Sequence, residues 1–176
     1  MKANIQRLAR ELARGTSDER IAALKEMRDL VSRGKTAGLF ELALRQVASE
    51  ENDVRWQSLI VIGEFIPLGA HNERIWSLIL EYCGIDDDMQ SALATVLLEH
   101  LLEHDFERTL DKIRGALEKS NPPLLDLVPR CGRFGESDSQ WRRLQDLIAP
   151  SRGGRTRITV EAKKRRRTEG RKKGRR

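Results

Sequence analysis

Two histidines near the middle of the chain, His100 and His104, have the type and spacing that could bind a metal ion, and Glu103 lies between them in a His-x-x-Glu-His order. On a helix, histidines four residues apart lie one turn apart, and their imidazole nitrogens are common zinc ligands. The same segment also reads as an ordinary helix end. Leu97 and Leu101 fall on one apolar face, and His104 lies near the terminal carbonyls, where positive charge is favourable. We therefore expect neither a metal nor another cofactor here.

Other patterns typical of catalysis are weak. The order His-x-x-Glu-His is that of inverted zinc proteases, but those enzymes have a much larger mixed α/β fold and need a further acidic ligand downstream. The chain has no Gly-rich phosphate loop and no Gly-x-Ser-x-Gly turn. The acidic run Asp86 to Asp88 suits the start of a helix, and Trp56, Trp76 and Trp141 lie in apolar stretches that predict packing roles. We expect a protein that is not an enzyme.

The C-terminal segment carries the clearest functional signal. Residues 151–176 hold thirteen Lys/Arg and two Glu, a net charge of +11, whereas residues 1–150 hold twenty Lys/Arg and twenty-five Asp/Glu, a net charge of −5. Dense positive charge releases condensed counterions when it meets a phosphate backbone. Because this segment has no aromatic residue to stack on bases, we expect it to bind nucleic acid with little preference for base sequence. The predicted nucleic-acid-binding residues form two clusters: Lys163, Lys164, Arg165, Arg166, Arg167, Arg171, Lys172, Lys173, Arg175 and Arg176.

Other roles for this basic tail are open. It could dock on an acidic protein surface or act as a nuclear-import signal in a eukaryote. A membrane is disfavoured as partner, because no apolar run approaches the roughly 18 residues of a membrane span and no hydrophobic anchor accompanies the charge. No signal peptide is evident, and Cys83 and Cys131 are expected to be reduced thiols. We expect an intracellular protein, cytoplasmic or nucleoid-associated, or nuclear in a eukaryote.

The elements that position these residues are predicted to be helices throughout. Apolar residues recur every three or four positions across residues 1–150, and alternating β-branched runs are absent there. Nine helices are predicted, starting near residues 3, 17, 36, 52, 72, 86, 105, 121 and 137, and the third is expected to run to residue 49. The expected caps of the second, fourth and ninth helices are Ser17 or Asp18, Asn52 or Asp53, and Ser137 or Asp138. We expect one helical domain over residues 1–150 and a flexible, disordered tail over residues 151–176.

A repeat organises the predicted helices. Asp18, Asp53 and Asp88 are each 35 residues apart, Pro123 is 35 residues further on, and each marks the first helix of a pair. A fixed repeat of this length indicates a stack of helical hairpins. Leucines at matching places in three successive first helices should then be buried: Leu24, Leu59 and Leu93.

The repeat also carries a motif. Asn-Asp-Val-Arg at 52–55, followed by Ser58, Leu59 and Gly63, resembles the first-helix pattern of HEAT repeats. Segments 17–24 and 88–93 are looser copies, and Gln90 replaces the arginine in the second of them. The resemblance covers roughly residues 17–149. It implies an all-α, short right-handed solenoid of antiparallel helical hairpins; a non-repetitive helical bundle is the alternative.

In HEAT proteins the second helices line the concave face. Carried over to this chain, that face would consist of the helices starting near residues 36, 72 and 105. Their exposed residues would include a protein-binding set of mixed charge: Arg45, Arg74, Glu81, Arg108, Asp111 and Arg114. Such a face suits a protein partner better than the basic groove that DNA requires.

The leading interpretation is a non-enzymatic adaptor or scaffold, with a protein partner on the solenoid and nucleic acid, DNA or RNA, on the tail. Two alternatives remain. One is a protein-only scaffold whose tail binds an acidic partner or directs localisation. The other is a DNA glycosylase of the HEAT-like kind, which would need a basic concave cleft.

Overall fold

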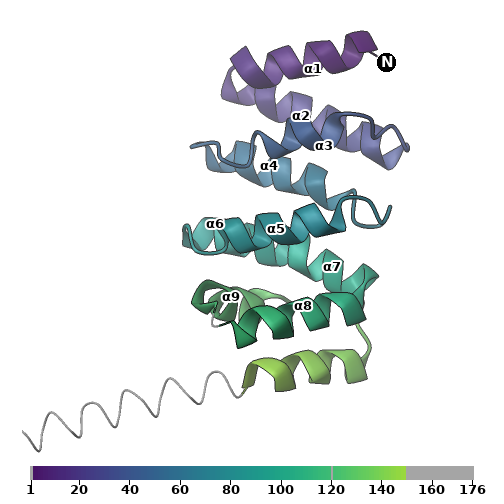
Figure 1. The fold of residues 1–176 in the computed structure, drawn as a ribbon. Coiled ribbons are helices and arrows are strands. Elements are labelled where there is room, and N and C mark those ends of the chain that lie inside the picture. The colour runs from purple at the N-terminus through teal and green to yellow at the C-terminus, as the bar shows by residue number, and fades with distance from the viewer. Residues whose placement is uncertain (1, 120, 150–176) are drawn as a thin grey trace, which may run out of the picture. The chain divides into compact units, whose positions relative to one another are not determined.

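The computed structural model describes residues 2–119 and 121–149, and this part of the chain is all-helical, with no strand (Figure 1). The predicted all-α class is therefore confirmed. The chain divides into two compact units, Met1–Glu136 and Ser137–Arg176. The predicted domain end at residue 150 and the predicted state of residues 151–176 lie at or beyond the edge of the described chain. None of the described helices is both long and apolar enough to cross a membrane.

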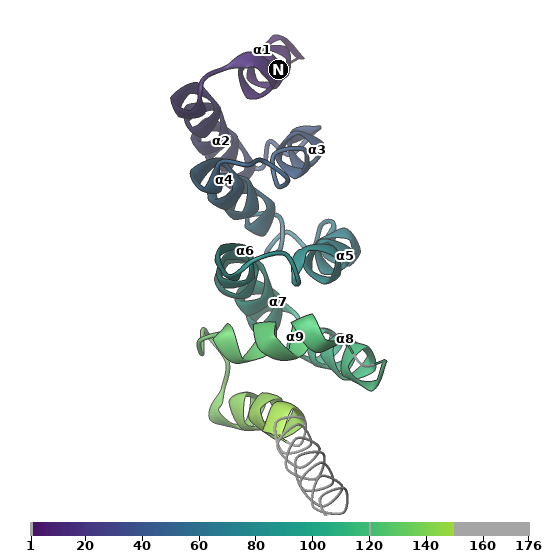
Figure 2. The same cartoon turned by 90° about the vertical axis from the view of Figure 1, so that its left-hand side faces the viewer.

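The first unit contains helices in two layers (Figure 2). In that view α1, α3, α5 and α8 form one layer, while α2, α4, α6 and α7 form the other. The helix bounds are α1 (Lys2–Arg14), α2 (Ser17–Ser32), α3 (Leu39–Leu44), α4 (Asn52–Gly63), α5 (Asn72–Tyr82), α6 (Asp87–Ala92), the π-helical η1 (Leu93–Leu98), α7 (Glu99–His104), α8 (Phe106–Glu118), α9 (Pro122–Leu127) and the 3₁₀-helical η2 (Val128–Arg130).

The helices α2, α4, α6 and α9 begin at a constant interval of the sequence. Their N-cap residues are Thr16, Glu51, Asp86 and Asn121, each 35 residues after the one before. Three of the four cap side chains accept a hydrogen bond from a first-turn backbone N–H; Glu51 does not. The 35-residue spacing read from the sequence is therefore present in the helix starts.

Two predicted caps are wrong by one residue or two. Ser17 or Asp18 was expected to cap α2, but the Thr16 hydroxyl accepts from the Glu19 N–H. The Glu19 carboxylate in turn accepts from the Thr16 N–H at 2.7 Å. This reciprocal pair, a capping box, satisfies two backbone donors at once and so fixes the helix start. Glu51, rather than Asn52 or Asp53, occupies the equivalent position before α4.

Two predicted helices differ in form. The helix expected over residues 36–49 is only α3, preceded by Gly38 at φ 74°. After α3, Gln46 and Val47 donate to carbonyls three residues back, at 2.9 and 3.3 Å, which tightens the chain into turns. The helix expected from residue 86 onward is continuous through residue 104, but its centre, η1, is π-helical. Apolar spacing does not distinguish an α-turn from a π-turn.

The core of the first unit confirms the predicted leucines. Leu24, Leu59 and Leu93 are each 0% exposed. They come from α2, α4 and η1, and α4 packs against both of the other two. One leucine from each successive repeat therefore fills the layer formed by the first helices.

The second unit has one described helix, over residues 138–149. Ser137 was predicted as a possible cap, and it makes the expected contacts. Its N–H donates to Gln140 Oε1 at 2.9 Å, and the Gln140 N–H donates back to Ser137 Oγ at 3.3 Å. The predicted cap at Ser137 is confirmed.

Candidate protein-binding face

The residues predicted to bind a protein partner lie in one layer of the first unit. All six are exposed: Arg45 directly follows α3, Arg74 and Glu81 lie on α5, and Arg108, Asp111 and Arg114 lie on α8. We call the surface of α3, α5 and α8 the α3/α5/α8 face. The ten predicted nucleic-acid-binding residues, Lys163 to Arg176, lie outside the described part of the chain.

Arg74 joins α5 to α3. Its guanidinium forms an ion pair with Glu41 and lies 5.2 Å from the centre of the Phe40 ring. His71, the N-cap of α5, stacks on the same ring with centroids 4.0 Å apart. The hydrogen bond from Arg74 lowers the pKa of Glu41. His71 has a positive φ of 64°, which is unusual for a residue other than glycine. The sequence did not predict that His71 and Arg74 pack on Phe40.

Glu73 joins α5 to α8. Its carboxylate accepts from Lys112 Nζ at 2.8 Å and also pairs with Arg108. The hydrogen bond from Lys112, followed by the charges of Lys112 and Arg108, lowers the pKa of Glu73. Exposed pairs of this kind contribute little to stability. Their effect on the face is to neutralise cations with carboxylates from the neighbouring helix.

The remaining predicted residues are not brought into these interhelical pairs. Asp111 and Arg114 pair with each other within α8 at 2.6 Å, while Arg45 and Glu81 join none of the ion pairs that link α3, α5 and α8. The face is therefore mixed in charge, as the sequence predicted, and its cations are largely paired.

A groove on this face was missed by sequence reasoning. It has a volume of about 560 Å³, and we call it the α5/α8 groove; its lining residues are Trp76, Leu80, Lys112, Gly115, Ala116, Lys119, Asn121 and Pro122. Trp76 is buried, with 8% of its surface exposed, as its predicted packing role requires. Lys112 Nζ lies 5.8 Å from the centre of its ring. The one feature of the sequence that pointed to this groove is Gly115 within α8, and a single glycine in a helix is a weak indication of a binding site.

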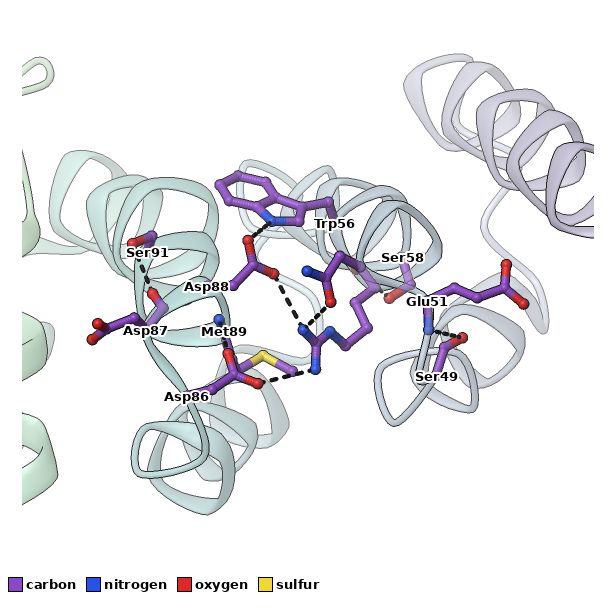
Figure 3. Close-up of polar contacts among 11 residues, drawn as sticks. Ser49, Glu51, Trp56, Ser58, Asp86, Asp87, Asp88, Met89 and Ser91 are labelled. Atoms are coloured by element: carbon purple, nitrogen blue, oxygen red, sulfur yellow. Dashed lines mark hydrogen bonds and ion pairs between the residues drawn. The ribbon is translucent and has the colours of Figure 1, made fainter.

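A second polar network links α4 to α6 (Figure 3). Arg55 is only 13% exposed and pairs with Asp86 and Asp88, each at 3.2 Å. Trp56 Nε1 donates to Asp88 at 3.0 Å, and Asp86 accepts from the Met89 N–H at 2.7 Å. The acidic run was correctly predicted to start a helix, but its contacts with α4 were not foreseen.

The pairing of Arg55 repeats along the chain. Arg20 on α2 pairs with Glu51 at 2.9 Å, and Arg55 on α4 pairs with Asp86. Both members of the second pair lie 35 residues after those of the first, so each arginine reaches the N-cap of the next first helix. Gln90, where a third arginine would stand, instead donates to the Cys83 carbonyl at 2.8 Å. The repeat thus extends from helix starts to side-chain contacts.

Replacing Asp86 by alanine is expected to reduce the free energy of unfolding by about 1 kcal/mol, because it removes a helix N-cap acceptor. The hydrogen bond from the Met89 N–H, with a smaller effect of Arg55, lowers the pKa of Asp86. A carboxylate whose pKa is lowered by folding stabilises the protein at pH values above its unfolded pKa, about 3.9 for aspartate. This stabilisation is lost as the pH falls through the pKa of the folded state. Urea unfolding of both proteins from pH 7 to pH 2 measures this difference.

Asp86→Asn is the matched control, because asparagine caps a helix about as well as aspartate. It should cost less than Asp86→Ala at pH 7. A difference between wild type and Asp86→Ala that stays constant down to pH 2 would show that the carboxylate contributes nothing through its charge.

The histidine pair makes separate contacts. His100 stacks on Phe134 with ring centroids 5.7 Å apart, while His104 Nε2 lies 3.5 Å from the Glu103 carboxylate. Within the described residues, no three His, Cys, Asp or Glu side chains are grouped as metal ligands would be.

The two cysteines, Cys83 and Cys131, are both buried and not paired in a disulfide, and burial raises the pKa of each thiol.

Comparison of the chain with protein-family models, with curated proteins and with solved structures found no significant match.

Proposed function

We propose that this protein is a non-enzymatic adaptor. Its helical unit is a right-handed, HEAT-like solenoid that holds a protein partner on the α3/α5/α8 face, and its basic tail binds nucleic acid. The 35-residue interval between the N-caps Thr16, Glu51, Asp86 and Asn121 supports the repeat assignment. So does the recurring arginine-to-cap pairing, because stacked repeats place equivalent residues in equivalent contacts.

The nucleic-acid role rests on one observation, which is that the excess of positive charge is confined to the tail. In the described residues, about half of the arginines outside the tail form ion pairs with carboxylates. The paired cations are Arg7, Arg20, Arg28, Arg55, Arg74, Arg108, Lys112, Arg114 and Arg130. Residues 1–150 are net negative, and residues 151–176 carry a net charge of +11. A phosphate backbone is attracted to the tail and repelled by the rest.

The test compares three full-length proteins on random-sequence duplex DNA and on single-stranded RNA. One has the natural tail; the second has the ten tail residues Lys163 to Arg176 named above replaced by Gln; the third has residues 151–176 in reversed order. The natural and reversed tails should bind alike, because phosphate contacts carry no sequence information. The Gln variant should not bind detectably. Binding that survives in the Gln variant would place the site on the helical unit and contradict the proposal.

A further inference from the structure

We infer that the α5/α8 groove binds an acidic peptide segment that inserts one bulky apolar side chain. This inference rests on the proposed protein-binding role of the α3/α5/α8 face and specifies the partner's chemistry. It begins from the lining of the groove, which combines an apolar floor with two cations and contains no carboxylate. The volume of about 560 Å³ lies within the roughly 300–1,000 Å³ typical of ligand sites.

The apolar part of the groove comes from three elements. Trp76 and Leu80 lie one turn apart on α5, Ala116 lies on α8, and Pro122 begins α9. Side chains this far apart in sequence form a concave apolar surface only because the helices pack together. An apolar side chain of a partner would remove the exposed part of this surface, at Leu80, Ala116 and Pro122, from water, which is the main source of affinity at such sites.

The cations are placed to receive a carboxylate. Lys112 is held over Trp76 and bonded to Glu73 at 2.8 Å, with 20% of its side chain exposed. Glu73 also pairs with Arg108, so a peptide carboxylate could share Lys112 without leaving Glu73 unpaired. Lys119, at the C-cap of α8, also lines the groove and is exposed. Two ammonium groups beside an apolar floor are complementary to an acidic and apolar segment.

Two other occupants fit less well. Nucleic acid would need an open aromatic face for stacking, but Trp76 is only 8% exposed. The chain's own tail, with its net charge of +11, would be repelled by Lys112 and Lys119. An acidic peptide is the occupant that the lining favours.

Gly115 supplies a direct way to block the groove. It lies within α8 and lines the groove, and a Cβ added to it would meet no heavy atom within 4 Å. A side chain at this position should therefore enter the groove, and the ring of Gly115→Phe should occupy part of its volume. Gly115→Ala is the matched control, because it raises the helix propensity of the same position and leaves most of the groove open.

The experiment selects binders from a phage-displayed library of random 12-residue peptides. The target is the full-length chain with its ten tail residues replaced by Gln, so that the tail cannot attract acidic peptides. Selected peptides should be enriched in Asp and Glu around a Trp, Phe or Leu. Gly115→Phe should weaken their binding at least tenfold, and Gly115→Ala should change it less than twofold. Lys112→Gln with Lys119→Gln should also weaken it about tenfold or more. Thermal unfolding checks that each variant is folded.

Several results would overturn the inference: no enrichment, enrichment of neutral or basic peptides, or acidic peptides insensitive to Gly115→Phe. Selected peptides that bind elsewhere on the α3/α5/α8 face, lost on Glu41→Ala with Arg74→Ala but not on Gly115→Phe, would sustain the adaptor proposal and refute this groove. An oligonucleotide whose binding falls in Gly115→Phe would make the groove a nucleic-acid site. Binding of nucleic acid to the natural tail, measured on the same groove variants, reports on the adaptor proposal separately.

Discussion

Raising the salt concentration from about 50 to about 200 mM is expected to weaken binding of the full chain to random-sequence duplex DNA by about a thousandfold or more. Each neutralised phosphate contributes a slope of about 0.9 log units of affinity per log unit of salt, because it releases condensed counterions. The ten cations in two tail clusters allow about six to ten such contacts. Fluorescence anisotropy across a salt series measures the slope.

The same series on single-stranded RNA should give a shallower slope for the same number of contacts, about 0.7 rather than 0.9 per phosphate. A chain ending at Pro150 should not bind at any salt concentration, and circular dichroism should show that it remains helical. A slope near zero would mean that phosphate contacts do not hold the complex. A truncated chain that binds as well as the full chain would move the site to the helical unit.

Leu59→Ala is expected to reduce the free energy of unfolding by about 2–5 kcal/mol. Leu59 is 0% exposed and lies on α4, which packs against α2 on one side and against α6 and η1 on the other. Truncation therefore leaves a cavity within the layer of first helices, and the surrounding helices can only partly close it. Urea-induced unfolding followed by circular dichroism gives the difference.

Leu68→Ala is the control for this substitution. It makes the same chemical change at a residue that is 52% exposed, so the free energy of unfolding should change by no more than about 0.5 kcal/mol. Equal effects at the two positions would indicate that α4 does not form part of a cooperatively folded core.

Local sequence was sufficient to predict much of the fold. The all-helical class and the 35-residue spacing follow from apolar periodicity and cap residues, which act over three or four positions. The burial of Leu24, Leu59 and Leu93 follows from the same repeat. The errors at Thr16 and Glu51 are of one or two residues, because several adjacent polar side chains can each serve as a cap and only the hydrogen bonds formed decide between them.

The candidate face was predicted in part. The sequence and the HEAT resemblance placed Arg74, Glu81, Arg108, Asp111 and Arg114 on helices that the structure finds in one layer. Their partners could not be predicted. Glu41 and Arg74 are 33 residues apart, and Glu73 and Lys112 are 39 apart, so which carboxylate meets which cation depends on how neighbouring helices align.

The sequence by itself determined the charge of the chain and, to within about three residues, the places where helices begin. A net charge of +11 in the last 26 residues is a property of composition, and a helix start is a local hydrogen-bonding event. Only the tertiary structure decided that Arg55 meets Asp86 and Asp88 and that Trp76, Lys112 and Pro122 line one groove. These contacts join residues more than 30 positions apart, or elements separated by a turn, and their geometry is set by packing rather than by local preference.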